Sequence, residues 1–185
     1  MLSQFSSVVN RALCVNKSLP MRRLKLHEYQ AGALLHKHGV AIPLGNVAFT
    51  ADEAKKVATD FGKNSPGYVV KSQVLGGGRG MGHFKETGFK SGVHLVYRPE
   101  DAQKMANEMI GKHLVTKQSG DSGFACNAVY LVEKINIEKE MYLSLALDRQ
   151  AGSACFIYSP AGGMAIEDVA HTNPEKIFKL HVDPQ

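Results

Sequence analysis

The sequence predicts an α/β or α+β fold whose later part is mainly antiparallel. Before Gly111, segments with apolar residues at helical spacing alternate with short apolar runs that fit strands. After Gly111, alternation at strand spacing dominates, and glycine and proline separate the runs. The expected order of elements is α-β-α-β-loop-β-α-β-β-β, which belongs to the mixed classes rather than to an all-α or all-β fold.

Start and stop signals place the helices. Residues 26–38 are expected to be helical and to end at Gly39, since glycine commonly follows the last helical residue. Thr50 and Glu53 have the spacing of a capping box at the start of a second helix. Pro99 begins a third helix, whose first turn carries acidic residues where the helix dipole favours them.

The expected strands are separated by turn residues. They cover residues 46–49, 68–74, 92–97, 128–133, 140–148 and 154–159. The run at 140–148 alternates most clearly, with Met141, Leu143, Leu145 and Leu147 on one side. Residues 166–170 are expected to open a short turn or helix.

Composition excludes several classes of protein. The chain has 185 residues, of which 44% are hydrophobic, and this is enough for one domain core. No run approaches the roughly 20 apolar residues of a membrane span, so no membrane partner is expected. The cysteines Cys14, Cys126 and Cys155 lack the spacing of a metal site, and their odd number argues against a disulfide framework.

The positive charge is concentrated at the N-terminus. Residues 1–23 are rich in serine, contain four Lys or Arg and lack acidic residues, which is typical of a mitochondrial transit peptide. These residues account for four of the net +5 charges, so residues 24–185 are nearly neutral and no nucleic-acid partner is expected. We therefore treat 24–185 as the folded domain and expect the protein in the mitochondrial matrix.

A glycine-rich loop follows an apolar strand that carries a lysine. Residues 69–82 read VVKSQVLGGGRGMG, and glycines let a backbone approach an anion and direct N–H groups at it. The loop is not a Walker A motif, because His83 stands where that motif has lysine, and no phase fits a dinucleotide fingerprint. Lys71 below the phosphates and a flap with Arg79 above them is the functional interpretation. A hairpin turn with a solvated arginine is the alternative.

A second feature is a strand–hinge–strand segment between Glu133 and Glu140. Such a hinge can pair a base through backbone groups, while a carboxylate accepts from ribose hydroxyls. The alternative is that both glutamates are solvated strand ends, which is common for carboxylates.

Five ordered motifs together resemble one family. They are LHEYQAGALLHKHGVAIPLG, VVKSQVLGGGRG, GKHLVTKQ, LVEKINIEKEMYL and SPAGGMAIEDVA. From 24 to 185 the chain resembles the N-terminal part of the succinate–CoA ligase (succinyl-CoA synthetase) β subunits, which are ATP-grasp enzymes. The resemblance implies the N-terminal portion of an ATP-grasp fold, incomplete at its C-terminal end.

The resemblance also implies contacts to a nucleotide. In chain order the matching residues are Pro43, Lys71, Gly78, Arg79, Gly80, Glu133 and Glu140. The lysine and the Gly-Arg-Gly run match phosphate contacts, and the two glutamates match positions beside the base and near the ribose. Pro43 favours ATP, with GTP as the alternative. The chain departs from many relatives at Met81, where they have lysine after the flap.

The implied activity belongs to an α/β heterodimer. Succinate, CoA and ATP give succinyl-CoA, ADP and phosphate in the citric acid cycle, through a phosphohistidine on the α subunit. No catalytic residue and no metal ligand is therefore expected within this chain, and Mg²⁺ ligands are expected beyond residue 185. As a fragment, the chain is expected to be inactive alone. Two alternatives stay open: a malate–CoA ligase β subunit, and an inactive short form that binds an α subunit.

Overall fold

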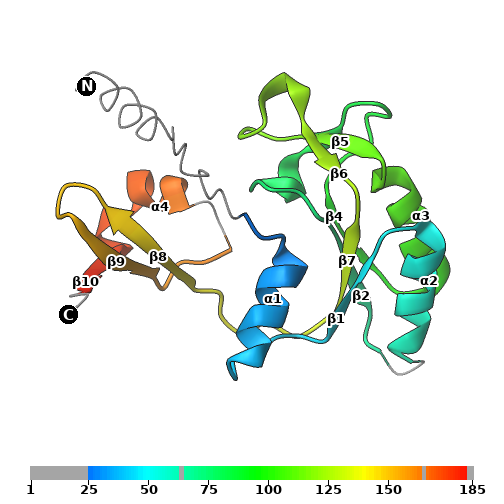
Figure 1. Cartoon of the computed structure of the whole chain (residues 1–185), viewed down its shortest axis with the longest axis horizontal. Helices are drawn as coiled ribbons and strands as arrows, with labels where there is room; N and C mark the ends of the chain where they lie inside the picture. Colours follow the sequence, from blue (N-terminus) through cyan, green and yellow to red (C-terminus); the bar gives the residue numbers. More distant parts are fainter. Residues whose placement is uncertain (1–24, 63–64, 164–165, 183–185) are drawn as a thin grey trace, which may run out of the picture.

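The computed structural model describes residues 25–62, 65–163 and 166–182, which form two lobes joined by a linker (Figure 1). The predicted leader, residues 1–23, lies outside the described residues. The helices are α1 (Glu28–Lys37), α2 (Ala51–Asp60), α3 (Pro99–Met109) and α4 (Ile166–Thr172), with single 3₁₀ turns η2 (Arg79–Met81), η3 (Gly120–Ser122) and η4 (Pro174–Lys176). The strands are β1 (Gly45–Ala48), β2 (Tyr68–Ser72), β3 (His83–Phe84), β4 (Val93–Val96), β5 (Lys112–Val115), β6 (Phe124–Cys126), β7 (Val129–Glu133), β8 (Tyr142–Asp148), β9 (Ser153–Ser159) and β10 (Phe178–Val182).

The first lobe is built on a four-stranded sheet in the order β1-β7-β2-β4, with every neighbouring pair antiparallel. Helices α2 and α3 pack together on one side of this sheet, and α1 lies on the other (Figure 1). Successive residues of a strand point to opposite faces, so Tyr68 and Val70 are buried in the core with α2 and α3. Lys71 points to the opposite side, where it meets α1.

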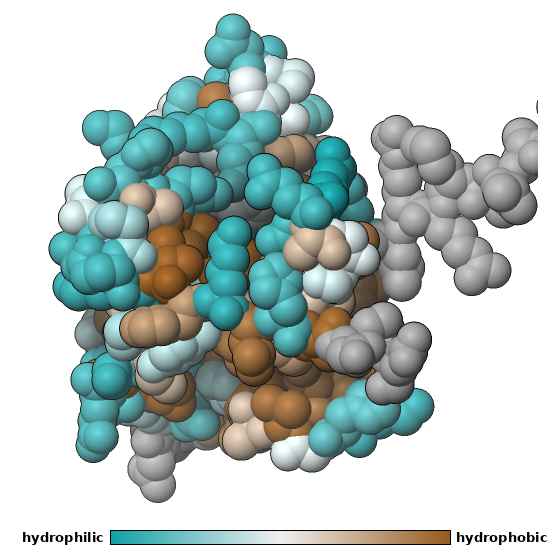
Figure 2. All heavy atoms as spheres, turned by 90° about the vertical axis from the view of Figure 1, so that its left-hand side faces the viewer, coloured by the Kyte–Doolittle hydropathy of each residue, from teal (hydrophilic) through white to brown (hydrophobic). Residues whose placement is uncertain are grey.

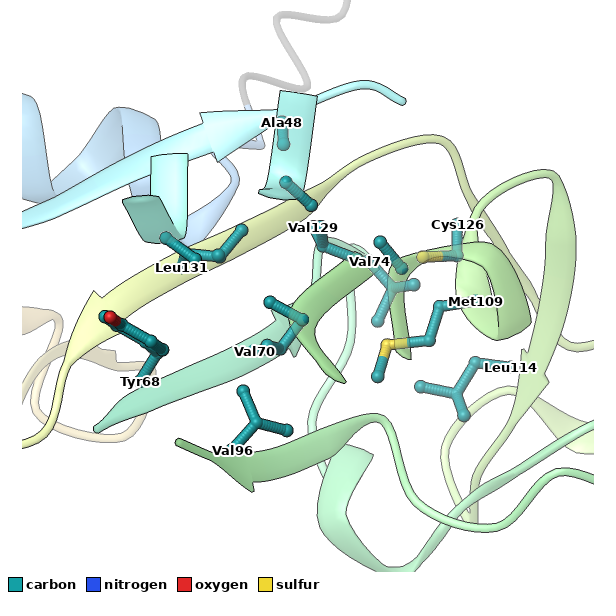
Figure 3. Close-up of a cluster of buried hydrophobic side chains, with 14 of the residues drawn as sticks. Ala48, Tyr68, Val70, Val74, Val96, Met109, Leu114, Cys126, Val129 and Leu131 are labelled. Carbon is teal, nitrogen blue, oxygen red and sulfur yellow. The ribbon is translucent and has the colours of Figure 1, made fainter. Parts of the chain in front are cut away.

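The core of the first lobe lies between the sheet and the helices α2 and α3 (Figure 3). Val70 of β2 and Leu131 of β7 are fully buried there, and Met109 of α3 and Leu114 of β5 close the same cluster. Burying one aliphatic side chain of this size stabilises a fold by about 1.5–3 kcal/mol. The two central strands are therefore the best-anchored part of the molecule.

The predicted capping box of α2 is present with one difference. The hydroxyl of Thr50 accepts a hydrogen bond from the backbone N–H of Glu53 at 3.1 Å, as expected. The carboxylate of Glu53 accepts from the N–H of Phe49 at 2.7 Å, one residue before the helix cap, rather than from Thr50. Gly39 has a φ of +79°, a conformation that suits glycine after the end of α1.

The expectation of three strands after Gly111 is wrong in number. β7, β8 and β9 are confirmed, but β5 and β6 precede them and form a second sheet in the order β3-β5-β6. β10 follows α4 and pairs with β9. The strands β3 and β6 have only two and three residues, which is too short for an alternating pattern to be visible in the sequence, and the four-residue run of β5 was not recognised as a strand.

The second lobe is a three-stranded antiparallel sheet in the order β10-β9-β8, with α4 beside it. Its buried residues are Cys155, Ser159 and Val169, none of which belongs to the core cluster of the first lobe. The other sheet face is apolar and exposed, and Figure 2 shows hydrophobic side chains at the surface on this end of the molecule. The exposed side chains come from paired positions on all three strands: Leu143, Leu145, Leu147, Phe156, Tyr158, Phe178 and Leu180.

The described part of the chain contains no helix that is both long and apolar enough to cross a membrane. Cys126 and Cys155 are buried free thiols, and Cys14 lies outside the described residues. Burial raises the pKa of the Cys126 thiol, which keeps it in the unreactive protonated form at neutral pH.

Leu131→Ala should lower the free energy of unfolding by about 2–5 kcal/mol, because it opens a cavity in a packed core. Leu145→Ala is the matched control, since this strand leucine is 63% exposed, and it should change stability by less than about 0.5 kcal/mol. Urea denaturation followed by far-ultraviolet circular dichroism measures both. Equal losses would contradict the assignment of the core to the first lobe.

Candidate functional site

An open cleft of about 1080 Å³ lies beside the glycine-rich loop. Residues 76–81 form one wall, and the segment that contains Lys25, Leu26 and Glu28 forms another. Gly163 and Asp168 reach the same cleft from the second lobe. Both lobes therefore contribute to one hollow, and the loop identified in the sequence lines it.

A carboxylate holds two cations together at the edge of this cleft. Glu28 is the first residue of α1, and its Oε1 atom accepts a hydrogen bond from Lys71 Nζ at 2.8 Å. Its Oε2 atom accepts from a guanidinium nitrogen of Arg79, also at 2.8 Å. Arg79 in addition donates to the carbonyl of Ser72 at 2.8 Å. The cluster thus joins α1, β2 and the glycine-rich loop.

The three side chains of this cluster are partly buried, with exposed fractions of 34% for Glu28, 26% for Lys71 and 21% for Arg79. Burial alone would raise the pKa of the Glu28 carboxyl. The hydrogen bond from Lys71 and the charges of Arg79 and Lys71 outweigh burial, so the pKa lies below its usual value. Glu28 is therefore ionised at neutral pH, and the cluster carries one net positive charge.

The glycine-rich loop is held in place from both sides. The N–H of Gly77 donates to Gln118 Oε1 at 2.8 Å, and the carbonyl of Arg79 accepts from Gly92 N–H at 2.8 Å. Gly78 has a φ of +73°, the left-handed region that glycine adopts without strain. A side chain at Gly76 would collide with the ring of Phe124. The Phe124 ring would have to shift to admit any residue larger than glycine at this point.

The structure brings the four predicted phosphate residues to one place. Gly78, Arg79 and Gly80 line the cleft, and Lys71 joins them through the shared carboxylate of Glu28. Two cations beside glycine backbone N–H groups form a region suited to a polyanion, since charge-assisted hydrogen bonds to phosphate are stronger than neutral ones.

Of the two predicted hinge glutamates, Glu133 lies at the other end of β2. In the pairing of β2 with β7, Glu133 lies opposite Tyr68 and Tyr130 lies opposite Lys71. These two pairs are three residues apart along the strands, which is roughly 10 Å. Glu133 N–H donates to the carbonyl of Leu44 at 2.9 Å, so the neighbouring Pro43 belongs to the same end of the sheet. Directly paired residues share a face, so the Glu133 side chain projects from the face opposite to Lys71.

Glu140 lies in the exposed linker before β8 and does not line the cleft directly. Its carbonyl accepts from Gly162 N–H at 3.1 Å, and its carboxylate lies against Gly163. Gly163 lines the cleft, so Glu140 lies directly behind the wall that the second lobe contributes.

Sequence reasoning missed Glu28. Its motif LHEYQ contributed to the family resemblance, but an acidic residue in a first helical turn is ordinary and carried no separate signal. Only the fold reveals its role, because Glu28 is 43 residues from Lys71 and 51 from Arg79 in the chain.

Two lobes around a cleft with a strand lysine and a glycine-rich loop form an arrangement suited to a nucleotide. Comparison with family models matches residues 25–185 to a family described as an ATP-grasp domain. The chain therefore belongs to the ATP-grasp family.

Curated relatives match most of the chain. The chain is 42% identical over 181 residues to the Arabidopsis thaliana protein named "Succinate--CoA ligase [ADP-forming] subunit beta, mitochondrial", covering 96% of this chain and 42% of that protein. It is 43% identical to the protein of that name from Saccharomyces cerevisiae (88% and 37% covered), and 47% identical to a bacterial β subunit from Erythrobacter litoralis (87% and 40%). The chain spans less than half the length of each of these relatives.

Solved structures confirm the fold. ATP citrate lyase from Methanothrix soehngenii, in complex with citrate and coenzyme A, matches 86% of this chain and 35% of its own with a TM-score of 0.58 and 18% identity. A dinucleotide-forming acetyl-coenzyme A synthetase from Ca. Korarchaeum cryptofilum matches 84% of this chain and 59% of its own, also with a TM-score of 0.58, at 17% identity. At these identities the likeness shows the fold alone.

Gly78→Ala should lower the free energy of unfolding by about 1–2 kcal/mol, because an L-residue is strained at its φ of +73°. Gly80→Ala is the matched control within the same loop: an added Cβ there meets nothing within 4 Å, and the φ is not in the left-handed region. Chemical denaturation of both variants measures the difference. A larger loss for Gly80→Ala would contradict the loop conformation.

Glu28→Gln should remove an acid-sensitive part of the stability. Because folding lowers the pKa of Glu28, its contribution is present above the unfolded value of 4.5 and is lost as pH falls through the lower folded value. The difference in unfolding free energy between the native chain and Glu28→Gln should therefore shrink with acidification below 4.5. Denaturation curves across this range test it, and a pH-independent difference would contradict the ion pairs.

Proposed function

We propose that the cleft binds the triphosphate of ATP. The observation that carries this proposal is the convergence of Lys71 and Arg79 on one carboxylate at the edge of a glycine-lined cleft. Lys71 contacts the phosphates from the sheet, and Gly78, Arg79 and Gly80 cover them from the loop. Many relatives have lysine at the position of Met81. In this chain the corresponding positive charge comes from Lys85, near the loop in the sequence, or from Lys25 at the cleft wall.

The hinge end of β2 receives the base. Since the Glu133 side chain projects from the face opposite to Lys71, we assign the contact to backbone groups of the hinge rather than to its carboxylate. Pro43 lies beside the hinge through the bond between Leu44 and Glu133. Glu140, on the second lobe's side, accepts from the ribose hydroxyls. ATP rather than GTP is favoured by the relatives, which are named ADP-forming.

This chain serves as the nucleotide-binding part of a succinate–CoA ligase β subunit. The overall reaction joins succinate and CoA, splits ATP and gives succinyl-CoA, ADP and phosphate, with an α subunit carrying the phosphorylated histidine. The contribution of this chain is to position the phosphoryl group and to stabilise its charge during transfer. The 42–47% identity to β subunits over most of the chain supports this assignment over a related acid–CoA ligase.

Phosphoryl transfer from ATP uses Mg²⁺, which neutralises the phosphate oxygens. Among the described residues, no three His, Cys, Asp or Glu side chains gather where they could hold a metal ion. We therefore assign none of these residues to Mg²⁺ and derive no step through it.

Import into the mitochondrial matrix fits the acid-free leader of residues 1–23. Relatives from Arabidopsis thaliana and Saccharomyces cerevisiae are named mitochondrial, whereas others are bacterial. Intact-mass measurement of the polypeptide captured from its own cells tests this directly. The leader prediction requires an N-terminus near residue 24, and a retained Met1 would contradict it.

The nucleotide proposal is tested by calorimetric titration of the 185-residue chain with ATP. Lys71→Met should weaken ATP binding about 10- to 100-fold, because it removes a charge-assisted hydrogen bond to phosphate. Lys104→Met is the control, since this lysine on α3 is 70% exposed and lies outside the cleft lining. Equal affinity for the native chain and Lys71→Met would overturn the assignment of the cleft.

The reaction itself is tested on the native complex captured from its own cells. CoA-dependent formation of ADP from ATP should require succinate, and replacing succinate by malate or ATP by GTP should lower the rate. Turnover with malate in place of succinate would replace the substrate assignment while leaving the nucleotide site intact.

A further inference from the structure

Glu28 is built into the cation cluster at the edge of the cleft rather than placed near it by chance. Each of its two carboxylate oxygens bonds a different cation, one from β2 and one from the glycine-rich loop. The neighbouring backbone is also tied to β2, because Tyr29 N–H donates to the buried side chain of Gln73 at 3.3 Å. The carboxylate is therefore held at a fixed point above the end of β2.

Other acidic residues at helix starts in this protein behave differently. At the start of α3, Asp101 pairs with Arg98 three residues away, and Glu100 pairs with Lys55 at 3.6 Å. Arg98 is 70% exposed and Glu100 is 57% exposed, so these pairs are on the surface and outside the cleft lining. An acid whose only role was to complement a helix dipole would resemble them. Glu28 instead bonds two cations at once, one with each carboxylate oxygen, and it lines the cleft.

The cluster retains capacity for a ligand. Lysine has three N–H donors and arginine five. Lys71 gives one bond to Glu28, and Arg79 gives one to Glu28 and one to the Ser72 carbonyl. The remaining donors of both side chains have no partner among the described residues. A phosphate group can therefore join the cluster without displacing the carboxylate.

We propose that Glu28 is a positioning residue for phosphate binding: it orients the Lys71 ammonium and the Arg79 guanidinium so that their other donors converge on one phosphate group. Without it, two like charges on long side chains would repel each other and sample many rotamers. This inference rests on the proposed nucleotide function and deepens it. It adds Glu28 to Lys71 and Arg79 at the phosphate end of the site, as a residue that contacts no ligand itself.

The sign of the effect separates positioning from simple electrostatics. Removing a negative charge beside a polyanion site strengthens anion binding if only the net charge matters. Removing a positioning residue weakens it, because the two cations lose their shared orientation. Glu28→Gln should therefore bind tripolyphosphate about tenfold more weakly, although it makes the site more positive.

The experiment titrates the full 185-residue chain with tripolyphosphate, ATP and AMP, and records the thermal unfolding of each variant. Glu28→Gln should lose affinity for tripolyphosphate and ATP while its affinity for AMP changes little, because AMP lacks the outer phosphates. Glu28→Asp keeps the carboxylate on a shorter stem and should restore part of the affinity. Glu86→Gln is the control, since Glu86 also accepts hydrogen bonds from a nitrogen-bearing partner, the backbone and ring of His113, but lies outside the cleft lining.

Each outcome decides the proposal. Unchanged or tighter binding of tripolyphosphate by Glu28→Gln overturns it, whatever the loss of thermal stability. Equal losses for Glu28→Gln and Glu86→Gln also overturn it, because they would reflect stability alone. If the native chain binds tripolyphosphate but not ATP, the nucleotide function fails, and the comparison of Glu28→Gln with Glu28→Asp still tests the positioning role. If the native chain binds neither, both proposals fail.

Discussion

The pairing of β2 with β7 is the interaction on which the rest of the structure depends. These two strands are central in the four-stranded sheet, and their inner side chains form the middle of the core. Their register places Lys71 opposite Tyr130 and Tyr68 opposite Glu133, so it sets the distance between Lys71 and Glu133. A shift by one residue would turn Lys71 into the core and expose Val70.

A second constraint follows from the chemistry of the cleft. A site for a polyanion needs cations close together, and cations close together repel each other in the absence of the ligand. The protein meets this constraint with one carboxylate that belongs to neither the sheet nor the loop. The same carboxylate attaches the start of α1 to the sheet. The ion pairs of Glu28 with Lys71 and Arg79 therefore both stabilise this part of the fold and fix the positions of the two cations.

The sequence was sufficient for features with local causes. The helix caps at Thr50 and Gly39, the long strands and the glycine-rich loop all depend on residues a few positions apart, and the structure has them close to the expected places. The short strands β3, β5 and β6 were not predictable, because strands of two to four residues form only where neighbouring segments supply partners. Glu28 was not predictable for the same reason: its partners are brought to it by the fold. The leader and the individual nucleotide contacts stay predictions.

The two lobes have separate sets of buried residues, so local unfolding of one lobe does not require unfolding of the other. The first lobe has a large contiguous core, whereas the second depends on a few buried residues and leaves one sheet face in water. The free energy of a local opening rises with the buried apolar area that it exposes, so we expect the amide protons of β8, β9 and β10 to exchange through openings that leave β2 and β7 closed. We therefore expect the second lobe to open more readily than the first, so a melting temperature read from the whole chain averages over both lobes.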